Sequence, residues 1–318
     1  MFKFVVLSVV ILLGLIGPPA TTAMNNNLTA ITWAHAVNNQ SLLDSVLSSD
    51  IQFIEADIVL GTLIDDATHT QQPIMAHPPA NTSDISLDKF LTQILNFNKA
   101  KDVDSKKGVK LDFKSIDVFE GSLVLLRSLW ESMNYPVWIN ADILPGPVNS
   151  TGTPVDADRF LAGCKSLTSS VLSIGWTTRW GNDFTEGAYN DTQIDGMIDA
   201  IKANQIIGSN HSITFPVRAG IAAQSQQNLH RLVDAVNEKN NVTLTIWSSA
   251  GDSVNVDLLR KLIFSFGVDK VYVDVPEELL KQLDLGNAPA RASSIIHFGM
   301  ITIVMLLTSS MFSNCQFS

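Results

Sequence analysis

Cysteine is almost missing from this chain of 318 residues, with only Cys164 and Cys315. Cys315 lies close to the C-terminus, so a disulfide bond inside the body of the protein is not expected. The fold must therefore be held by a large hydrophobic core and not by covalent cross-links. Cys164 lies in a stretch with helical periodicity and is predicted to be a buried free thiol.

Basic residues are also scarce. The chain has 21 Lys and Arg against 31 Asp and Glu, a formal net charge of −10. This balance argues against nucleic acid as a partner. An anionic substrate would require a locally positive site.

The first residues have the pattern of a signal peptide. Lys3 precedes the apolar run Phe4–Ile16, prolines follow at Pro18 and Pro19, and Ala23 ends a small-residue cleavage site. The run is too short for an ordinary membrane span, although an uncleaved anchor is the alternative. We expect residues 1–23 to be removed in the secretory pathway.

The C-terminal segment 287–318 is a second apolar region. Ile295–Phe312 carries no formal charge and no Lys or Arg follows it, while small residues lie upstream at Gly286–Ala288 and Ala292–Ser294. Small residues, a spacer and an apolar tail are typical of a GPI-anchor signal. A single membrane span is the alternative. Either would place the protein on the extracellular face of the plasma membrane, and loss of the tail without an anchor would leave it secreted.

Seven Asn-x-Ser/Thr sequons support an extracellular glycoprotein, because they are spread over the whole region between the two apolar ends. Their asparagines are Asn27, Asn39, Asn81, Asn149, Asn190, Asn210 and Asn241.

The region 24–286 alternates short β-rich segments with helical ones. The helical segments repeat apolar residues on one face, as in Leu87, Phe90, Leu91 and Ile94. The β-rich segments number eight. Eight strands that alternate with helices in one domain predict an α/β fold of the (β/α)₈ TIM-barrel type. A doubly wound open sheet is the alternative, but the chain lacks the glycine-rich phosphate loop typical of that fold. The predicted strands are Ala30–Ala34, Gln52–Val59, Val109–Phe113, Val137–Ala141, Val171–Trp176, Ile213–Val217, Thr243–Trp247 and Lys270–Asp274.

Two further features concern residues outside these strands. Gly61–Asp84 is longer than a normal loop and is expected to make an excursion above the barrel mouth. His69, His211 and His230 are expected at the surface.

Polar residues gather where the predicted strands end, which is where barrel enzymes hold their active sites. Asn140 and Asp142, Arg218, Trp247 and Asp274 end four of these strands. Arg218, Trp247 and Asn140 are accordingly predicted to bind substrate.

The first three strands bring together ionisable residues. Glu55 and Asp57 share one face of their strand, and Asp112 lies on the next. Three carboxylates form a hard oxygen site that suits Mg²⁺, and also Ca²⁺, better than zinc. His35 and His77 could then act as acid and base, and Lys114 could hold an anionic oxygen. Each residue alone could be a cap or an ion pair, but their clustering favours a site.

Four motifs in order resemble the menorin family. They are Trp33–Asn38 (WAHAVN), Phe53–Asp57 (FIEAD), Pro73–Pro79 (PIMAHPP) and Gly108–Lys114 (GVKLDFK). That family is similar to the phospholipase C-like phosphodiesterase barrels, which include glycerophosphodiester phosphodiesterases and spider sphingomyelinase D. The segments Leu244–Ser248 and Gly267–Pro276 resemble the last two strands of the glycerophosphodiesterases.

The resemblance implies roles for single residues. His35 and His77 match the two acid–base histidines, Glu55, Asp57 and Asp112 match the metal carboxylates, and Lys114 matches the lysine after the third carboxylate. The chain departs from the glycerophosphodiesterases at Ala36, where they have Arg, and at Pro78, where they have Asp. Val37-Asn38 is closer to the sphingomyelinase D form, and Arg218 is expected to replace the missing Arg.

Two functions follow. The first is metal-dependent cleavage of a glycerol or lipid phosphodiester. The second is a non-catalytic cell-surface adhesion or signalling glycoprotein that binds an extracellular protein partner and uses the barrel as a scaffold. A fold alone does not separate them.

Overall fold

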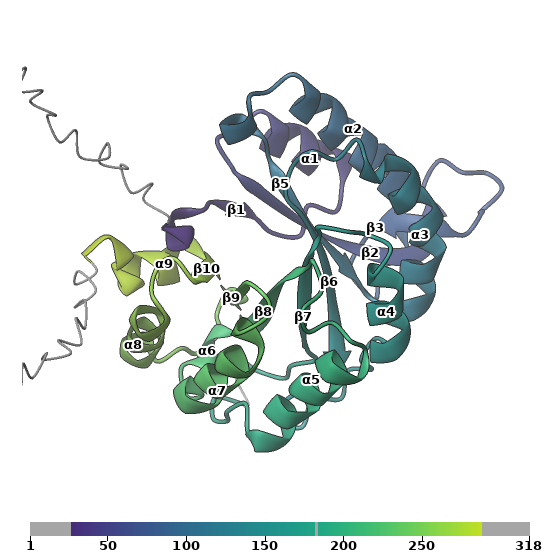
Figure 1. The fold of residues 1–318 in the computed structure, drawn as a ribbon. Helices are drawn as coiled ribbons and strands as arrows, with labels where there is room; N and C mark the ends of the chain where they lie inside the picture. The colour runs from purple at the N-terminus through teal and green to yellow at the C-terminus, as the bar shows by residue number, and fades with distance from the viewer. Residues whose placement is uncertain (1–26, 182–183, 288–318) are drawn as a thin grey trace, which may run out of the picture.

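The apolar, β-branched segments of the sequence form eight parallel strands, each paired with the next, in a nearly closed barrel (Figure 1). The computed structural model describes residues 27–181 and 184–287. This arrangement confirms the predicted parallel α/β barrel, and each predicted strand has its counterpart. The strands are β1 (Trp33–Ala34), β2 (Phe53–Leu63), β5 (Gly108–Phe113), β6 (Val137–Leu144), β7 (Val171–Trp176), β8 (Ser212–Arg218), β9 (Val242–Trp247) and β10 (Val271–Asp274).

Helices alternate with the strands and pack their apolar faces against the barrel. In α2 the residues Leu87, Phe90, Leu91 and Ile94 are fully buried, as the periodicity predicts. The helices are α1 (Gln40–Leu47), α2 (Leu87–Lys99), α3 (Ile116–Trp130), α4 (Ala157–Cys164), α5 (Asp191–Ala203), α6 (Ala219–Ala222), α7 (Gln226–Asn237), α8 (Val256–Phe266) and α9 (Glu277–Leu283), with short 3₁₀ turns at Leu28–Ala30, Val103–Ser105 and Leu285–Asn287.

Local sequence signals set the helix ends. The side chain of Ser86 accepts a hydrogen bond from Lys89 N at the start of α2. Asn190 and Gln193 form a reciprocal capping box at the start of α5. Gly267 ends α8 with a φ of 97°, a conformation that glycine adopts without a steric penalty.

The excursion after β2 differs in part from the expectation. β2 continues to Leu63, and the chain returns as β3 (Gln72–Met75), antiparallel to β2, before β4 (Thr82–Ser83) pairs with β2 again. The first part of the expected loop is therefore strand. Because Ala76 N donates to Asp57 O at 3.1 Å, the following residue, His77, is held beside the mouth of the barrel.

Aromatic rings fill the N-terminal end of the barrel. Trp33 lies 4.6 Å from Phe53 between ring centroids, and Trp138 lies 4.7 Å from Tyr272. Gly108 belongs to this packing, because a Cβ there would lie 2.4 Å from the Phe53 ring. The aromatic layer closes the barrel below the polar residues.

Within the described residues, β1 and β10 share no backbone ladder, so they are the two ends of the strand order. The 3₁₀ turn before β1 connects to the segment before β10, because Leu28 N donates to Val268 O at 2.8 Å. Trp33 and Tyr272 are also in edge contact at 6.2 Å. Side chains and flanking segments thus complete the barrel.

Several further expectations can be compared with the described residues. Cys164 is fully buried, as predicted, and burial raises the pKa of its thiol. His69 is exposed and His230 is partly exposed, but His211 is buried and the prediction for it was wrong. Its ring lies beside Ser170, whose Oγ is 3.1 Å from Nδ1 of the imidazole.

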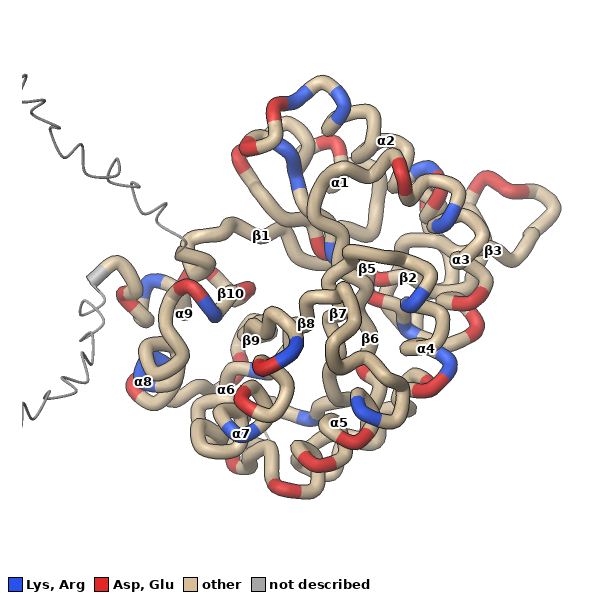
Figure 2. The backbone as a smooth tube through the Cα atoms, in the orientation of Figure 1, with Lys and Arg blue, Asp and Glu red and all other residues tan. Residues whose placement is uncertain are grey.

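Other expectations fall outside the described part of the chain. The predicted signal peptide 1–23, the apolar tail from residue 288 onward and Cys315 are not among the described residues. Among those that are, no helix has the length and apolarity needed to span a bilayer. Figure 2 shows Lys and Arg interspersed with Asp and Glu around the molecule. The absence of a nucleic-acid partner stays a prediction.

Candidate functional site

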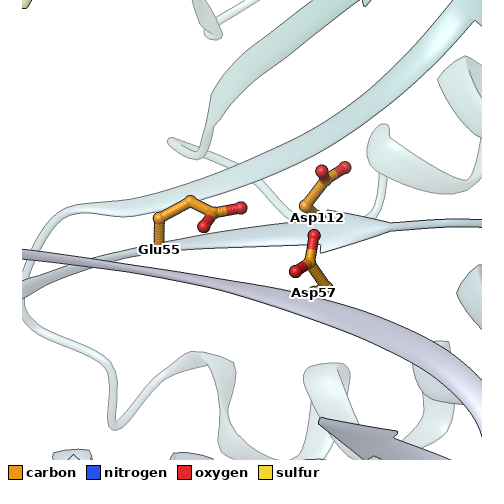
Figure 3. Close-up of side chains that lie close together, drawn as sticks. All are labelled: Glu55, Asp57 and Asp112. Carbon is orange, nitrogen blue, oxygen red and sulfur yellow. The ribbon is translucent and has the colours of Figure 1, made fainter. Parts of the chain in front are cut away.

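Glu55, Asp57 and Asp112 converge inside the barrel. Glu55 and Asp57 alternate along β2 and so point to the same side, and the strand register places Asp57 opposite Asp112 on β5. One carboxylate oxygen from each of the three lies within 4.8 Å of the others. Figure 3 shows the three side chains lying close together on neighbouring strands. The strand pairing thus brings together the carboxylates that the sequence predicts as metal ligands.

Each carboxylate is oriented by a hydrogen-bond donor from a neighbouring segment. Ala36 N donates to Glu55 Oε2 at 2.8 Å, and Asn38 Nδ2 donates to Asp57 Oδ2 at 2.7 Å. Asn140 Nδ2 donates to Asp112 Oδ1 at 2.6 Å. These bonds fix one oxygen of each carboxylate, while Asp57 Oδ1 and Asp112 Oδ2 lie against Lys114 Nζ.

The conformation of Ala36 is unusual for a residue with a side chain. Its φ of 54° lies in the left-handed region, which costs a non-glycine residue roughly 1 kcal/mol. The strained turn directs the Ala36 amide toward Glu55. Strain concentrated beside a cluster of ionisable groups is typical of functional sites.

Lys114 lies between two of the carboxylates. Its Nζ is 2.7 Å from Asp57 Oδ1 and also pairs with Asp112 Oδ2. Burial would lower the pKa of this lysine, but the charges of Asp112 and Asp57 outweigh it and raise the pKa above its usual value. Lys114 is therefore a fixed positive charge at the edge of the cluster.

His35 is held by carboxylates through one ring nitrogen. Its Nδ1 is 3.0 Å from Asp274 Oδ2 and 3.4 Å from Glu55 Oε2, and the side chain is 52% exposed. Burial lowers the pKa of the imidazole, but the hydrogen bond with Asp274 and the charge of Glu55 raise it to about 9. The other ring nitrogen, Nε2, is left for a ligand.

His77 is held differently, by a backbone carbonyl. Its Nδ1 lies 2.7 Å from the carbonyl oxygen of Pro78, to which a protonated Nδ1 donates. A neutral ring in this tautomer has an unprotonated Nε2 that can accept a proton. The proline at position 78 thus still supplies an orienting partner, through its carbonyl.

The cluster carries more negative than positive charge. Burial raises the pKa of Glu55, and the charge of Asp57 adds to this, although the charge of His35 opposes it. Burial and the charge of Asp112 raise the pKa of Asp142 to about 7. Although burial opposes it, Lys114 holds the pKa of Asp112 below its usual value. A divalent cation would relieve this repulsion among the carboxylates.

The two histidines, Lys114 and the three carboxylates line one cavity of about 600 Å³ at the mouth of the barrel. Arg218, Trp247 and Asn140 line it as well. Arg218 lies 5.0 Å from the Trp247 ring and donates to Asp252 through Nε at 2.9 Å and Nη2 at 2.8 Å. Asn140 is bonded to Asp112. The role of these three residues in binding substrate stays a prediction.

Sequence reasoning had assigned no role to several residues of this site. Asn38 was part of the first motif, and Asp142 and Asp274 were recognised only as polar strand ends. Asp252 comes from the loop after β9, and no pattern in the sequence indicated that it would pair with Arg218.

Comparison with known proteins extends this description. The family model "Menorin N-terminal domain" matches residues 27–280, which includes every residue of the site. The chain belongs to the menorin family. This menorin-family chain is also 37% identical to Protein FAM151B from Homo sapiens over 259 residues, which covers 80% of the chain and 87% of that protein.

Solved structures with similar folds are more distant from this menorin-family chain. A glycerophosphoryl diester phosphodiesterase from Parabacteroides distasonis matches with 14% identity and a TM-score of 0.43, over 83% of the chain and 89% of that structure. A fungal β-1,4-galactanase matches with 9% identity and a TM-score of 0.39, over 77% and 84%.

Proposed function

We propose that this protein is a divalent-cation-dependent phosphodiesterase that cleaves a glycerol or lipid phosphodiester. The observation that carries the proposal is the joint placement of three converging carboxylates, a bridging lysine and two histidines around one cavity. The motif resemblance to phosphodiesterase barrels supports the same reaction class.

The donor set fits a hard cation. Three carboxylates offer oxygen atoms within 4.8 Å of one another, and the negative charge of the cluster exceeds what Lys114 compensates. Mg²⁺ binds through few carboxylates and keeps several waters, so it suits this set, and Ca²⁺ is the second choice. A cation held by Glu55, Asp57 and Asp112 would polarise a phosphoryl oxygen.

The remaining groups divide the proton transfers. His77, with Nε2 free to accept, takes the proton from a substrate hydroxyl whose oxygen then forms a bond to phosphorus. His35, with Nδ1 held by Asp274, gives a proton from Nε2 to the leaving oxygen as its bond to phosphorus breaks. The products are a cyclic phosphodiester and an alcohol. Lys114 stabilises the negative charge on the phosphoryl oxygens.

The test uses the purified protein with glycerophosphocholine, lysophosphatidylcholine and sphingomyelin as substrates, in Mg²⁺ and in EDTA. We expect release of the alcohol in Mg²⁺ only. Asp57→Asn should lose turnover and weaken the rise in melting temperature caused by Mg²⁺. Asp234→Asn, at an exposed position on α7, is the control and should match the wild type. A wild type with no dependence on any cation would overturn the metal assignment.

One observation favours a second function, the non-catalytic cell-surface binding protein. The Arg of the glycerophosphodiesterases is replaced by Ala36, and the donors of Arg218 are occupied by Asp252. If Mg²⁺ stabilises the protein but none of the phosphodiesters is cleaved, binding of an extracellular protein partner becomes the better account.

We also propose that the protein is GPI-anchored on the extracellular face of the plasma membrane. The small residues and uncharged tail support the anchor, and exposure of six sequon asparagines supports a glycoprotein. Phosphatidylinositol-specific phospholipase C should release the protein from cells. Retention together with a cytoplasmic epitope at Ser318 would instead indicate a spanning helix. The exposed asparagines are Asn39, Asn81, Asn149, Asn190, Asn210 and Asn241, while Asn27 is half-buried and accepts from Thr29.

A further inference from the structure

Lys110 is a buried lysine that lines the cavity below the carboxylates. It lies on β5, opposite Glu55 on one side and Trp138 on the other, and is 4% exposed. Its ammonium group forms no hydrogen bond or ion pair with any residue that the structure describes. Because Lys110 lines the cavity and its Nζ is not one of the fully buried atoms without a partner, the donors of the ammonium group are open to a ligand in the cavity.

The other cationic side chains of the cavity are already paired. Lys114 bridges Asp57 and Asp112, and Arg218 is bidentate to Asp252. Among the lysine and arginine side chains that line the cavity in the described part of the chain, Lys110 alone keeps its donors unused. An anion that enters the cavity could therefore accept hydrogen bonds from the ammonium group of Lys110.

Lys107 is a buried lysine with a structural role, and its contacts differ from those of Lys110. Lys107, three residues earlier, is buried to the same degree, at 5% exposed. Its Nζ donates to Ser49 O at 2.7 Å and to Ile51 O. Burial of Lys107 is thus compensated by two carbonyl groups, whereas Lys110 has no such partner and faces open volume.

The charges around Lys110 explain why it can remain buried. Its positive charge acts on Glu55, Asp112 and Asp142, the carboxylates that face it from β2, β5 and β6. This attraction works at a distance and leaves the three N–H donors of the ammonium group free. A divalent cation on the carboxylates would neutralise part of their charge and make the position more favourable for an anion.

We propose that Lys110 is the deep anion-binding contact of the cavity and donates a hydrogen bond to a non-bridging oxygen of a tetrahedral phosphoryl group. The proposal rests on the proposed function for its ligand class, a phosphoryl group, and a cation on the three carboxylates would favour the anion without being required for it. It assigns to Lys110 a role separate from that of Lys114, which is committed to Asp57 and Asp112. The ligand class is a phosphate ester or free phosphate, and no bond is made or broken by the lysine.

The experiment uses inorganic phosphate as the probe, on wild type, Lys110→Met and Lys107→Met, each in Mg²⁺ and in EDTA. We expect phosphate to raise the melting temperature of the wild type beyond the rise given by Mg²⁺ alone. Lys110→Met should keep the Mg²⁺ effect and bind phosphate about tenfold or more weakly, the size expected for loss of a hydrogen bond to a charged group. Lys107→Met should lower the melting temperature and leave the phosphate affinity unchanged.

A second measurement on the wild type does not depend on the folding of any variant. Reductive dimethylation followed by mass spectrometry reports the modification rate of each lysine. Phosphate should slow the modification of Lys110 and leave the rate at exposed Lys89 unchanged. A glycerol phosphodiester that protects Lys110 while free phosphate does not would identify the ester as the ligand.

The outcomes separate this inference from the proposed function. The wild type could show no Mg²⁺ effect while phosphate still protects Lys110. This result would contradict the metal assignment and support the anion site. Unchanged modification of Lys110 in both phosphate and the glycerol phosphodiester, or equal affinity of wild type and Lys110→Met for whichever of the two binds, would overturn the anion site whatever the protein catalyses.

Discussion

His35 Nδ1 lies 3.0 Å from Asp274 Oδ2, and this contact joins the residue that follows the first strand of the barrel to the end of the last strand. In the described residues β1 and β10 share no backbone hydrogen-bond ladder, so side-chain contacts connect the two ends of the sheet at the mouth of the barrel. The same contact orients the imidazole for chemistry. One interaction therefore links completion of the barrel to the position of the proposed acid.

Asp274→Asn tests this link. The amide keeps the shape of the side chain but removes the charge that favours a protonated His35. We expect kcat for the phosphodiester to fall by about 10²-fold or more, the usual contribution of general acid–base catalysis, while the Mg²⁺ effect on melting temperature remains. Both are read from steady-state kinetics and thermal unfolding.

The leaving group provides the control for this prediction. Glycerol p-nitrophenyl phosphate keeps the attacking hydroxyl and releases p-nitrophenolate, which needs no protonation. The Asp274→Asn variant should therefore lose much less activity on it than on a glycerol phosphodiester with an alkyl leaving group. An equal loss on both substrates would show that Asp274 does not act through protonation of the leaving oxygen.

Lys114→Met should strengthen the response to the cation. In the wild type the ammonium group neutralises Asp57 and Asp112, as a divalent cation would. Without it the free energy of unfolding in EDTA should fall by roughly 3 kcal/mol, the cost of breaking a buried ion pair, and Mg²⁺ should restore more stability than it gives the wild type. Urea unfolding in EDTA and in Mg²⁺ measures both.

Lys89→Met is the matched control for Lys114→Met, because Lys89 is exposed on α2. Its response to Mg²⁺ should equal that of the wild type. If Lys114→Met lost the response instead, the lysine would be needed to assemble the carboxylates and would not compete with the cation.

The site could be predicted from the sequence as far as strand ends determine it. Parallel strands of a barrel share one carboxyl end, so polar residues at the ends of separate predicted strands had to meet, as Asp57 and Asp112 do. Alternation within a strand placed Glu55 on the same side as Asp57.

What escaped prediction depends on loops and on packing in three dimensions. Asp252 reaches Arg218 from a loop whose path follows no periodic pattern. The antiparallel return of β3 came from a segment that also reads as loop. His211 is buried because neighbouring segments cover it, and its own sequence context is polar.

Gly108→Ala should destabilise the aromatic layer at the N-terminal end of the barrel. A Cβ at this position would lie 2.4 Å from the ring of Phe53, which is itself fixed by Trp33 at 4.6 Å and Trp138 at 4.9 Å. Overpacking of this kind costs about 1–3 kcal/mol. Gly121→Ala, in α3 with nothing within 4 Å of the added Cβ, should instead stabilise by roughly 0.5–1 kcal/mol. Urea unfolding of both variants measures the difference in the free energy of unfolding. If Gly108→Ala leaves this free energy unchanged, the aromatic rings can move to make room for the added methyl group.

The buried His211 should make stability depend on pH. Burial lowers the pKa of its imidazole, although the carbonyl of Ser170 partly opposes this. In the unfolded chain the pKa of the His211 imidazole is about 6.5, so the unfolded chain binds a proton there more readily than the folded protein does. This contribution to stability is fully present above the unfolded pKa and is lost as the pH falls through the folded pKa.

The variant His211→Asn should flatten the part of the pH profile that comes from this residue, because an amide can still donate to Ser170 O but does not titrate. His69→Asn is the control, since His69 is exposed with a φ of 50°, a conformation that Asn tolerates. Urea unfolding at a series of pH values between about 7.5 and 5.5 gives the slope for each variant. We expect the wild type and His69→Asn to have the same profile, and His211→Asn to gain stability relative to both as the pH falls, because the titrations of His35 and Asp142 are common to all three proteins. The same slope in all three would mean that His211 is protonated as readily in the folded protein as in the unfolded chain.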